Sequence, residues 1–351
     1  MEHRPLGTSD LQLSVFGLGT MTFGAEADEA TSHAILDRFV DDGGTFIDTA
    51  DVYTRGVSET IIGSWLADRG GTDGLTIATK ARFPMSDDPA DRGAGRAHLE
   101  RAVDASLSRL GIDIIDLYQI HAWDPATPLE ETLQTLDQLV TAGKIRAAGV
   151  SNYTGWQLQR AVITARYEGW APIVSLQPKY SLLSRDIELE LLPLCLEENL
   201  GVLPWSPLGG GWLTGKYTPE EGPTGATRLG ENPARGIEAY DLRNTDRTWA
   251  ILEVVRAVAR ARDTTMSQVA LNWVRGRPGV TSVLLGARSV EQLVDNMAAL
   301  SWELNDNEVS VLNEVSAPGI PIYPHGFMET YAGVTIWEDL MTRVEPPAIG
   351  R

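Results

Sequence analysis

The sequence predicts an α/β fold, specifically a (β/α)8 TIM barrel, and three observations support this class. Short apolar runs recur at intervals of about 30 residues along the chain. Most of them are apolar at successive residues, which is typical of parallel strands that are covered on both faces. Stretches with helical spacing of apolar residues lie between them. Repeated strand and helix units of this kind indicate a closed parallel barrel.

Eight runs are expected to form the strands of this barrel. They span residues 14–20, 44–50, 74–80, 114–121, 146–152, 172–177, 201–207 and 281–287. Helices are expected at residues 29–42, 58–68, 98–110, 129–142, 156–167 and 186–198. An open doubly wound sheet is the alternative, but such sheets rarely contain eight units with so even a spacing.

The whole chain, residues 1–351, is expected to form a single domain with its core at about 4–316. Residues 209–245, after the seventh strand, are rich in glycine, proline and charge, and they predict a long loop. Residues 317–351 are expected to form a C-terminal tail over the barrel mouth. The first dozen residues are expected to form a short hairpin at the opposite end.

Composition excludes several classes of partner. The chain has 29 Lys and Arg against 48 Asp and Glu, a net charge of −19, which disfavours binding to nucleic acid or to an anionic membrane. Cys195 is the only cysteine and lies in an apolar helical stretch, so we expect it to be core packing. Without a signal segment or an apolar run of about 18 residues, a soluble cytoplasmic protein is expected.

Ionisable side chains stand at the ends of successive predicted strands. Asp48, Lys80 and His121 end the second, third and fourth runs, and Tyr53 follows Asp48 by five residues. An unpaired buried charge is costly, so packing alone would not select these residues. Because TIM-barrel chemistry occurs at the C-terminal ends of the strands, they predict a converging polar site.

Each of these residues also has a purely structural interpretation. Asp48 alone is more often a turn or cap residue, and Lys80 alone can be a lysine that extends to a rim. His121 alone is more often a hydrogen-bonded histidine, and Tyr53 alone a packed aromatic residue. All four on successive strands favour the functional interpretation.

Other chemistries receive less support. The five histidines, His3, His33, His98, His121 and His325, show no HxH or HExxH spacing, so no metal site is expected. Lys80 could form the Schiff base of an aldolase, but that reaction does not explain the set of Tyr53, Asp48 and His121.

The sequence blocks GTFIDTADVY, ATK, QIH, GVSNY, LQPKYSLL, SPLGGGWLTGKY and GARSVEQLVDN resemble those of the aldo-keto reductase family. They occur in family order and cover about residues 4–325, and together they are highly specific. The pattern is more similar to the branch that contains potassium-channel β subunits and aryl-alcohol reductases than to the mammalian aldose reductases.

The resemblance implies a role for each residue of the polar site. Tyr53 would protonate a carbonyl oxygen as nicotinamide delivers hydride to the carbon, and His121 would hydrogen-bond that carbonyl. Free tyrosine has a pKa of about 10, and a nearby cation such as Lys80 lowers it. Asp48 would hold Lys80 in place and compensate its charge.

The resemblance also implies the cofactor contacts, since GLGTMTFG (17–24) lacks the third glycine of a Rossmann motif. Hydrogen bonds to the nicotinamide carboxamide, stacking on its ring, and contacts to pyrophosphate, ribose and adenine would be divided among one set of residues. These are Thr20, Met21, Asp48, Ser151, Asn152, Gln177, Trp205, Ser206, Leu208, Lys216, Arg228, Gly286, Arg288, Gln292 and Asn296.

Arg288 favours NADPH over NADH. It precedes a predicted helix N-terminus, which is a good site for an anion, and its guanidinium suits a 2′-phosphate. Ser289 could equally serve only as the cap of that helix. Six aromatic residues could line the substrate pocket and suggest an apolar or aromatic aldehyde or ketone: Phe23, Phe83, Trp123, Trp212, Tyr323 and Phe327. A regulatory subunit that binds the cofactor with little turnover remains the alternative function.

Overall fold

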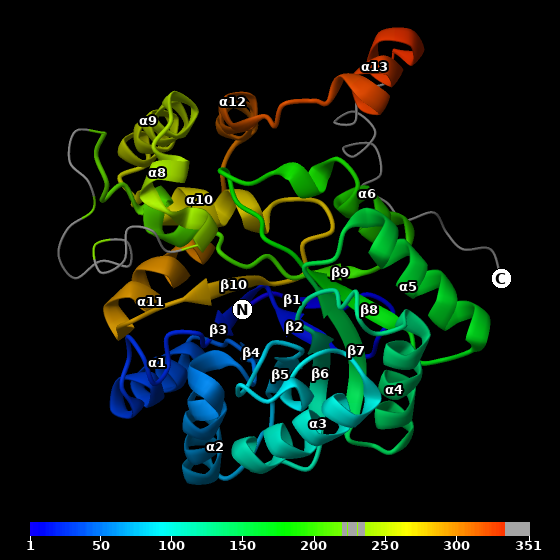
Figure 1. The fold of residues 1–351 in the computed structure, drawn as a ribbon. Coiled ribbons are helices and arrows are strands. Elements are labelled where there is room, and N and C mark those ends of the chain that lie inside the picture. The colour runs from blue at the N-terminus through cyan, green and yellow to red at the C-terminus, as the bar shows by residue number, and fades with distance from the viewer. Residues whose placement is uncertain (220–222, 224–229, 231–235, 334–351) are drawn as a thin grey trace. The chain divides into compact units, whose positions relative to one another are not determined.

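The computed structural model describes residues 1–219, 223, 230 and 236–333 (Figure 1). The chain divides into two compact units. Unit 1 consists of Met1–Pro178, Glu190–Leu203 and Gly279–Leu293, and unit 2 of Lys179–Leu189, Pro204–Pro278 and Val294–Arg351. The organisation of the chain as one domain stays a prediction.

Unit 1 contains eight strands in one sheet, and every neighbouring pair is parallel. The order of the strands across the sheet is β10-β3-β4-β5-β6-β7-β8-β9. Their bounds are β3 Phe16–Gly19, β4 Phe46–Asp48, β5 Thr76–Ala81, β6 Ile115–Ile120, β7 Ile145–Ser151, β8 Ile173–Gln177, β9 Gly201–Val202 and β10 Val283–Gly286.

The two outer strands of this order come together and close the sheet. Val202 in β9 forms a parallel bridge with Val280, just before β10. The Val202 amide donates to the Gly279 carbonyl at 3.2 Å, and the Thr281 amide donates to the Val202 carbonyl at 2.9 Å. These bonds satisfy the sheet edges, as a barrel requires. The predicted (β/α)8 fold class is therefore confirmed, and the open sheet is not.

An N-terminal hairpin lies at one end of the ring. Strands β1 (His3–Pro5) and β2 (Gln12–Ser14) pair antiparallel, and Leu6 and Leu11 between them are buried. A Cβ added at Gly7 would lie 2.3 Å from the Val174 carbonyl oxygen, which belongs to the beginning of β8. The predicted hairpin is thus confirmed, and it contacts the N-terminal end of a barrel strand.

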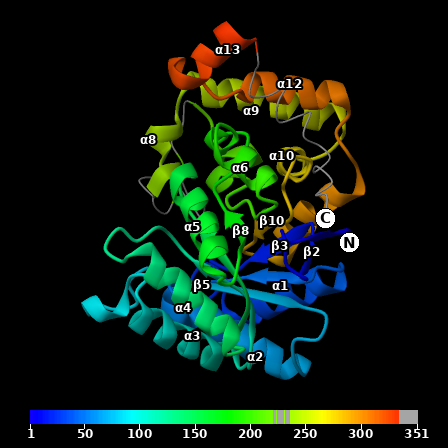
Figure 2. The ribbon, with the colours of Figure 1, turned by 90° about the vertical axis from the view of Figure 1, so that its right-hand side faces the viewer.

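Helices cover the outside of the strands in unit 1. Figure 2 shows α2, α3 and α4 together on the outer side of the sheet. Helix α3 contacts β5, α4 contacts β7, and α5 contacts β8. The bounds are α1 Glu29–Asp41, α2 Val57–Arg69, α3 Arg96–Leu110, α4 Leu129–Thr141, α5 Gly155–Glu168 and α6 Leu191–Glu197. The C-terminal glycines Gly70, Gly111 and Gly169 have positive φ, as expected for residues that end a helix.

One predicted helix is wrong. Residues 186–198 form two pieces, a 3-10 turn at Asp186–Glu188 and helix α6, rather than one helix. Pro193 explains the break, because proline has no amide hydrogen to donate to the carbonyl of Leu189 four residues earlier. Cys195 in α6 is 1% exposed, and burial raises the pKa of its thiol, which confirms its role in the core.

Unit 2 is mostly helical. Its described elements are η3 Asp186–Glu188, η4 Gly209–Thr214, η5 Gly236–Glu238, α8 Tyr240–Arg243, α9 Asp246–Ala261, α10 Met266–Arg275, η6 Ala298–Ser301, α12 Asp306–Ser316, η7 Ile322–Gly326 and α13 Phe327–Ala332. Helix α11 (Val290–Met297) belongs partly to each unit.

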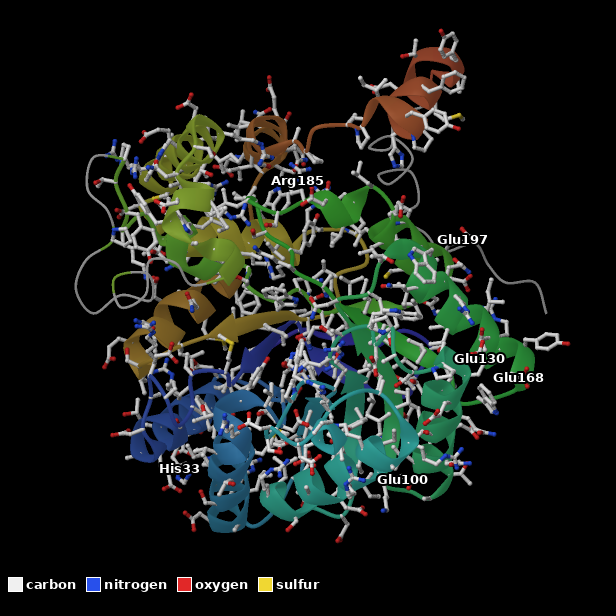
Figure 3. The ribbon with its side chains drawn as sticks, in the orientation of Figure 1. His33, Glu100, Glu130, Glu168, Arg185 and Glu197 are labelled. Atoms are coloured by element: carbon white, nitrogen blue, oxygen red, sulfur yellow. The ribbon has the colours of Figure 1, made fainter. Side chains whose placement is uncertain are left out.

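Arg185 is a buried cation of unit 2 with several hydrogen bonds (Figure 3). It is 1% exposed and donates to both carboxylate oxygens of Glu188, at 3.0 and 3.1 Å. It also donates to the Ser316 hydroxyl at 2.6 Å, and therefore joins η3 to the end of α12. A buried charge is tolerated when its donors are satisfied in this way.

The predicted loop and tail are only partly described. Residues 209–245 contain η4, η5 and α8, while residues 220–222, 224–229 and 231–235 lie outside the described residues. The tail forms η7 and α13, and residues 334–351 lie outside the described part as well. The position of the tail over the barrel mouth stays a prediction. In the described residues, no helix is long and apolar enough to cross a bilayer.

Helices α2 and α3 meet at Gly63, and this contact gives a test of the packing. A Cβ at Gly63 would lie 2.2 Å from the Arg109 carbonyl oxygen and 3.0 Å from Leu110. We expect Gly63→Ala to lower the free energy of unfolding by about 2 kcal/mol, because the overlap outweighs the gain in helix propensity. Gly319→Ala, where a Cβ meets no atom within 4 Å, is the control. Urea unfolding measures both, and equal stabilities of the two variants would contradict the packing.

Candidate active site

A buried ion pair lies at the C-terminal ends of β4 and β5. Lys80 Nζ donates to Asp48 Oδ2 at 2.6 Å and to the Thr49 carbonyl oxygen at 2.7 Å. The side chains of Lys80 and Asp48 are 0% and 2% exposed. Asp48 is the last residue of β4, so the chain turns directly from this ion pair into the loop that carries Tyr53.

The second carboxylate oxygen of Asp48 accepts hydrogen bonds from two glutamine side chains of other strands. Gln119 in β6 donates to Asp48 Oδ1 at 3.1 Å, and Gln177, the last residue of β8, donates to the same atom at 2.9 Å. Asp48 is thus the point where side chains of β5, β6 and β8 converge on β4. Gln119 was not among the predicted site residues. Its signal in the sequence is a polar residue within an apolar run, two positions before His121.

Tyr53 begins the short 3-10 segment η1 (Tyr53–Gly56) and contacts Lys80. The ammonium of Lys80 lies 5.2 Å from the centroid of the phenol ring, and a hydrogen bond joins the two side chains. Thr54 and Arg55 have φ of 50° and 53°, an uncommon conformation for residues with a Cβ. The Thr54 hydroxyl holds this turn by donating to the Phe23 carbonyl at 3.1 Å.

Charges around Lys80 keep it protonated. Burial alone lowers its pKa, but the carboxylate of Asp48 and the oxygen of Tyr53 oppose this, and the pKa of Lys80 lies above its ordinary value. The ion pair therefore offsets the desolvation of the ammonium group.

His121 follows β6 and lies beside Tyr53. The ring centroids of His121 and Tyr53 are 5.9 Å apart in an edge arrangement, and Phe83 lies 4.7 Å from the histidine on another side. Burial, then Lys80 and Arg82, hold the pKa of His121 well below its ordinary range, so the ring is neutral at pH 7. Within the described residues, its Nδ1 atom is buried and has no hydrogen-bond partner.

Asn152 connects His121 to the next strand end. Its amide donates to the His121 carbonyl at 3.0 Å and to the Ser151 hydroxyl at 2.9 Å. Ser151 in turn donates to the Gln177 carbonyl at 2.8 Å. Asn152 has φ 56°, which asparagine tolerates better than most residues. The structure therefore brings together Asp48, Tyr53, Lys80 and His121, with Ser151, Asn152 and Gln177 bonded around them.

Five other predicted cofactor residues belong to unit 1. Thr20 is fully buried, and its hydroxyl donates to the Asp48 carbonyl at 3.1 Å. Met21 follows it and is partly exposed, and Gly286 is the exposed last residue of β10. The backbone amide of Arg288 donates to the Gln292 side chain at 3.0 Å, which bonds the start of α11. Gln292 lies in that helix.

Arg288 has an incomplete set of partners. Its Nη2 atom lies 3.6 Å from Glu26 Oε1, and in the part of the chain that is described this buried nitrogen has no hydrogen bond. Ser289 accepts from the Gln292 amide at 3.4 Å, so the capping role expected for this serine is present. The free N–H groups at a helix N-terminus need acceptors, so the guanidinium donors of Arg288 take no part in this cap.

Six predicted cofactor residues belong to unit 2. Trp205 has Lys179 Nζ 5.9 Å from its ring centroid, and the Ser206 hydroxyl accepts from the Gly210 amide at 3.1 Å. Lys216 Nζ lies 5.3 Å from the Tyr217 ring. Leu208 precedes η4, and Asn296 is 5% exposed in α11. Arg228 lies outside the described residues.

Two of the aromatic residues expected in the pocket are core residues. Phe23 and Trp212 are 0% exposed, whereas Phe83 and Trp123 are partly exposed. Tyr323 and Phe327 in the tail are 77% and 48% exposed. Among the described residues, no group of three His, Cys, Asp or Glu side chains is placed to hold a metal ion.

A second acid, which the sequence reasoning missed, lies behind the Tyr53 loop. Asp51 is 1% exposed, and among the described side and main chains neither of its carboxylate oxygens has a hydrogen-bond partner. Burial, then the charge of Glu59, raise the pKa of Asp51 to about 7, with Arg109 and Lys80 opposing. Glu59 itself is bonded to Thr79 and Arg109, both at 2.6 Å.

This raised pKa predicts a pH-dependent stability. Asp51 stays protonated in the folded state while it ionises in the unfolded state, so stability falls as the pH rises from about 4 to about 7. Asp51→Asn removes this loss. We expect its effect on the free energy of unfolding to be about 2 kcal/mol more stabilising at pH 8 than at pH 5. Urea unfolding at the two pH values measures the difference, and an effect independent of pH would contradict the assignment.

Comparison with known proteins identifies the family of this chain. The family model described as Aldo/keto reductase family matches residues 15–317. The chain is 36% identical over 324 residues to the Uncharacterized oxidoreductase YrpG of Bacillus subtilis, an alignment that covers 90% of this chain and 96% of that protein. It is 35% identical over 354 residues to Protein tas of Escherichia coli, with 90% and 97% covered.

A fungal relative has a named activity. The chain is 32% identical over 333 residues to Norsolorinic acid reductase B of Aspergillus parasiticus, and the alignment covers 91% of this chain and 85% of that protein. Since the family model spans most of the sequence and these relatives exceed 30% identity over nine tenths of it, the chain belongs to the aldo/keto reductase family of oxidoreductases.

Proposed function

We propose that this enzyme reduces an aldehyde or ketone to an alcohol, reversibly and with NADPH, and that Tyr53 is the general acid. One observation carries the proposal: Lys80, fully buried and charged, is shared between Asp48 and Tyr53. When bound, NADPH supplies the hydride that reaches the carbonyl carbon. The proton that completes the alcohol must come from the protein.

Tyr53 is suited to give that proton because a cation lies beside it. The attraction that raises the pKa of Lys80 acts equally on its partner and favours the phenolate that remains after proton transfer. The proton of the Tyr53 hydroxyl goes to the carbonyl oxygen, and the charge left on the phenol oxygen is balanced by the Lys80 ammonium. Asp48 keeps the ammonium in place and leaves the pair without net charge.

His121 is suited to hold the substrate. A neutral imidazole can donate one hydrogen bond to a carbonyl oxygen without competing with Tyr53 as an acid. Its depressed pKa supports that role across the neutral range. Asn152 fixes the main chain of His121 through the bond to its carbonyl oxygen.

Polar side chains around Asp48, Tyr53, Lys80 and His121 can hydrogen-bond a nicotinamide dinucleotide. Ser151, Asn152 and Gln177 would hold the carboxamide, with Thr20, Met21, Asp48 and Gly286 close to the same strand ends. Trp205, Ser206, Leu208, Lys216 and Arg228 would contact the ring, ribose and pyrophosphate, and Gln292 and Asn296 the adenine. Arg288 fits a 2′-phosphate because its buried Nη2 has no hydrogen bond within the described residues. This supports NADPH over NADH.

The substrate and setting are proposed in broader terms. Phe83, whose ring lies 4.7 Å from the His121 ring, and Trp123, two residues after His121 in the sequence, are partly exposed. They support an apolar or aromatic carbonyl compound. The net charge of −19 disfavours nucleic-acid and membrane partners, and we propose a cytoplasmic enzyme that acts as one barrel domain.

The role of Tyr53 predicts the behaviour of a phenylalanine variant. Tyr53→Phe should lower kcat for aldehyde reduction by about 10²- to 10⁴-fold, because the proton donor is lost and the ring is retained. NADPH affinity, measured by fluorescence quenching, should change little. Tyr167→Phe, on an exposed tyrosine of α5, is the control. Tight NADPH binding by the wild type without reduction of any carbonyl in a panel would instead favour a regulatory cofactor-binding subunit.

Arg288 predicts a change in cofactor preference. Arg288→Glu should weaken binding of NADPH about 100-fold more than binding of NADH, because it removes a charge-assisted contact and adds repulsion to the phosphate. Calorimetric titration with each cofactor gives the two dissociation constants. Equal losses for both cofactors would show that Arg288 does not recognise the 2′-phosphate.

A further inference from the structure

Arg82 has an uncommon backbone conformation. It follows β5 directly, two residues after Lys80, and its φ is 138°. A residue with a Cβ rarely adopts such a φ, and outliers of this kind concentrate at functional sites. The Arg82 carbonyl accepts from the Gly93 amide at 2.9 Å, so the main chain is held while the side chain is left to other partners.

The guanidinium of Arg82 lacks the partners that a half-buried cation needs. Its Nε atom is buried and forms no hydrogen bond within the described ranges of the chain. The ion pair that it forms with a described residue is long, with Nη2 at 4.0 Å from Asp124 Oδ1, and the Arg82 side chain is 24% exposed. Buried donors without acceptors cost free energy, so the site as it stands is incomplete.

The carboxylate of Asp124 does not satisfy the donors of the Arg82 guanidinium, because it accepts hydrogen bonds from other groups. The Ala94 amide and the Thr127 hydroxyl donate to Oδ2 at 2.8 and 2.7 Å, and the Ala126 amide donates to Oδ1 at 3.1 Å. Asp124 therefore organises its own loop. In a protein of net charge −19, a cation that no nearby carboxylate approaches closely is unusual.

Arg82 lies near the residue that would hold the substrate carbonyl. Its guanidinium carbon is 5.4 Å from the Phe83 ring centroid, and that ring is 4.7 Å from the His121 ring. Phe83 therefore contacts both the cation and the His121 ring, and its partly exposed ring is suited to pack against an apolar substrate body. The charge of Arg82 also contributes to the low pKa of His121.

We propose that Arg82 binds a carboxylate carried by the carbonyl substrate, so that the preferred substrates are aromatic aldehydes or ketones with a carboxylate at the end remote from the carbonyl. This inference rests on the proposed function and specifies its substrate class. A guanidinium presents paired donors in the geometry that a carboxylate accepts. The aromatic body would lie along Phe83 while the carbonyl reaches His121 and Tyr53.

Matched substrates test the proposal by turnover. The ratio of kcat/KM for 4-carboxybenzaldehyde to that for 4-methylbenzaldehyde, with NADPH, should exceed about ten in the wild type. Arg82→Gln should lower this ratio about ten-fold or more, and Arg82→Lys should retain part of it because the charge remains. Arg69→Gln, which removes an exposed cation of α2, is the control and should leave the ratio as it is.

A binding experiment separates this inference from the proposed reaction. Calorimetry with 4-methylbenzoate in the presence of NADP⁺ should give a dissociation constant that is about ten-fold larger for Arg82→Gln than for the wild type, because the variant binds the carboxylate more weakly. Equal constants, or an equal substrate ratio in the two proteins, would overturn the role of Arg82 while the reduction of 4-methylbenzaldehyde still supports the proposed function. Absence of turnover on both aldehydes, with the binding difference present, would instead overturn the proposed reaction.

Discussion

The ion pair of Asp48 and Lys80 is the interaction on which the rest of the site depends. Two opposite charges that are almost wholly removed from water lose much hydration free energy, and only close contact and further hydrogen bonds offset that loss. Here the contact is 2.6 Å, the ammonium also reaches the Thr49 carbonyl, and two glutamines complete the carboxylate. Removing either member would leave its partner as an uncompensated buried charge.

The ion pair also separates the roles of the neighbouring groups. It keeps Lys80 charged despite burial, and the same positive charge helps to keep His121 neutral. The Tyr53 phenol beside the Lys80 cation is suited to donate a proton. The neutral His121 imidazole is suited to form a hydrogen bond. Because these properties follow from fixed neighbours, the site needs no rearrangement to acquire them.

The fold and the main polar residues could be predicted from the sequence because both follow from local patterns. Continuous apolar runs identify parallel strands, and a charged residue at the end of such a run is conspicuous. Gln119 was missed because its importance depends on its register with Lys80 in the neighbouring strand, which no single run reveals. Arg82 and Asp51 were missed because their partners, or lack of partners, are properties of the folded chain. The prediction of one helix over residues 186–198 is wrong because Pro193 cannot donate a backbone hydrogen bond to the preceding turn.

The bonds to Asp48 have a mechanical consequence. Strands β4 and β8 stand four places apart in a ring of eight, so they face each other across its axis. The hydrogen bond from Gln177 to Asp48 therefore joins two strands on opposite sides of the barrel, and Gln177 also donates to Gln119. This hydrogen bond opposes separation of β4 and β8 at the C-terminal end of the ring. The loops above it are then free to diverge in length and composition while the reacting groups beneath keep their spacing.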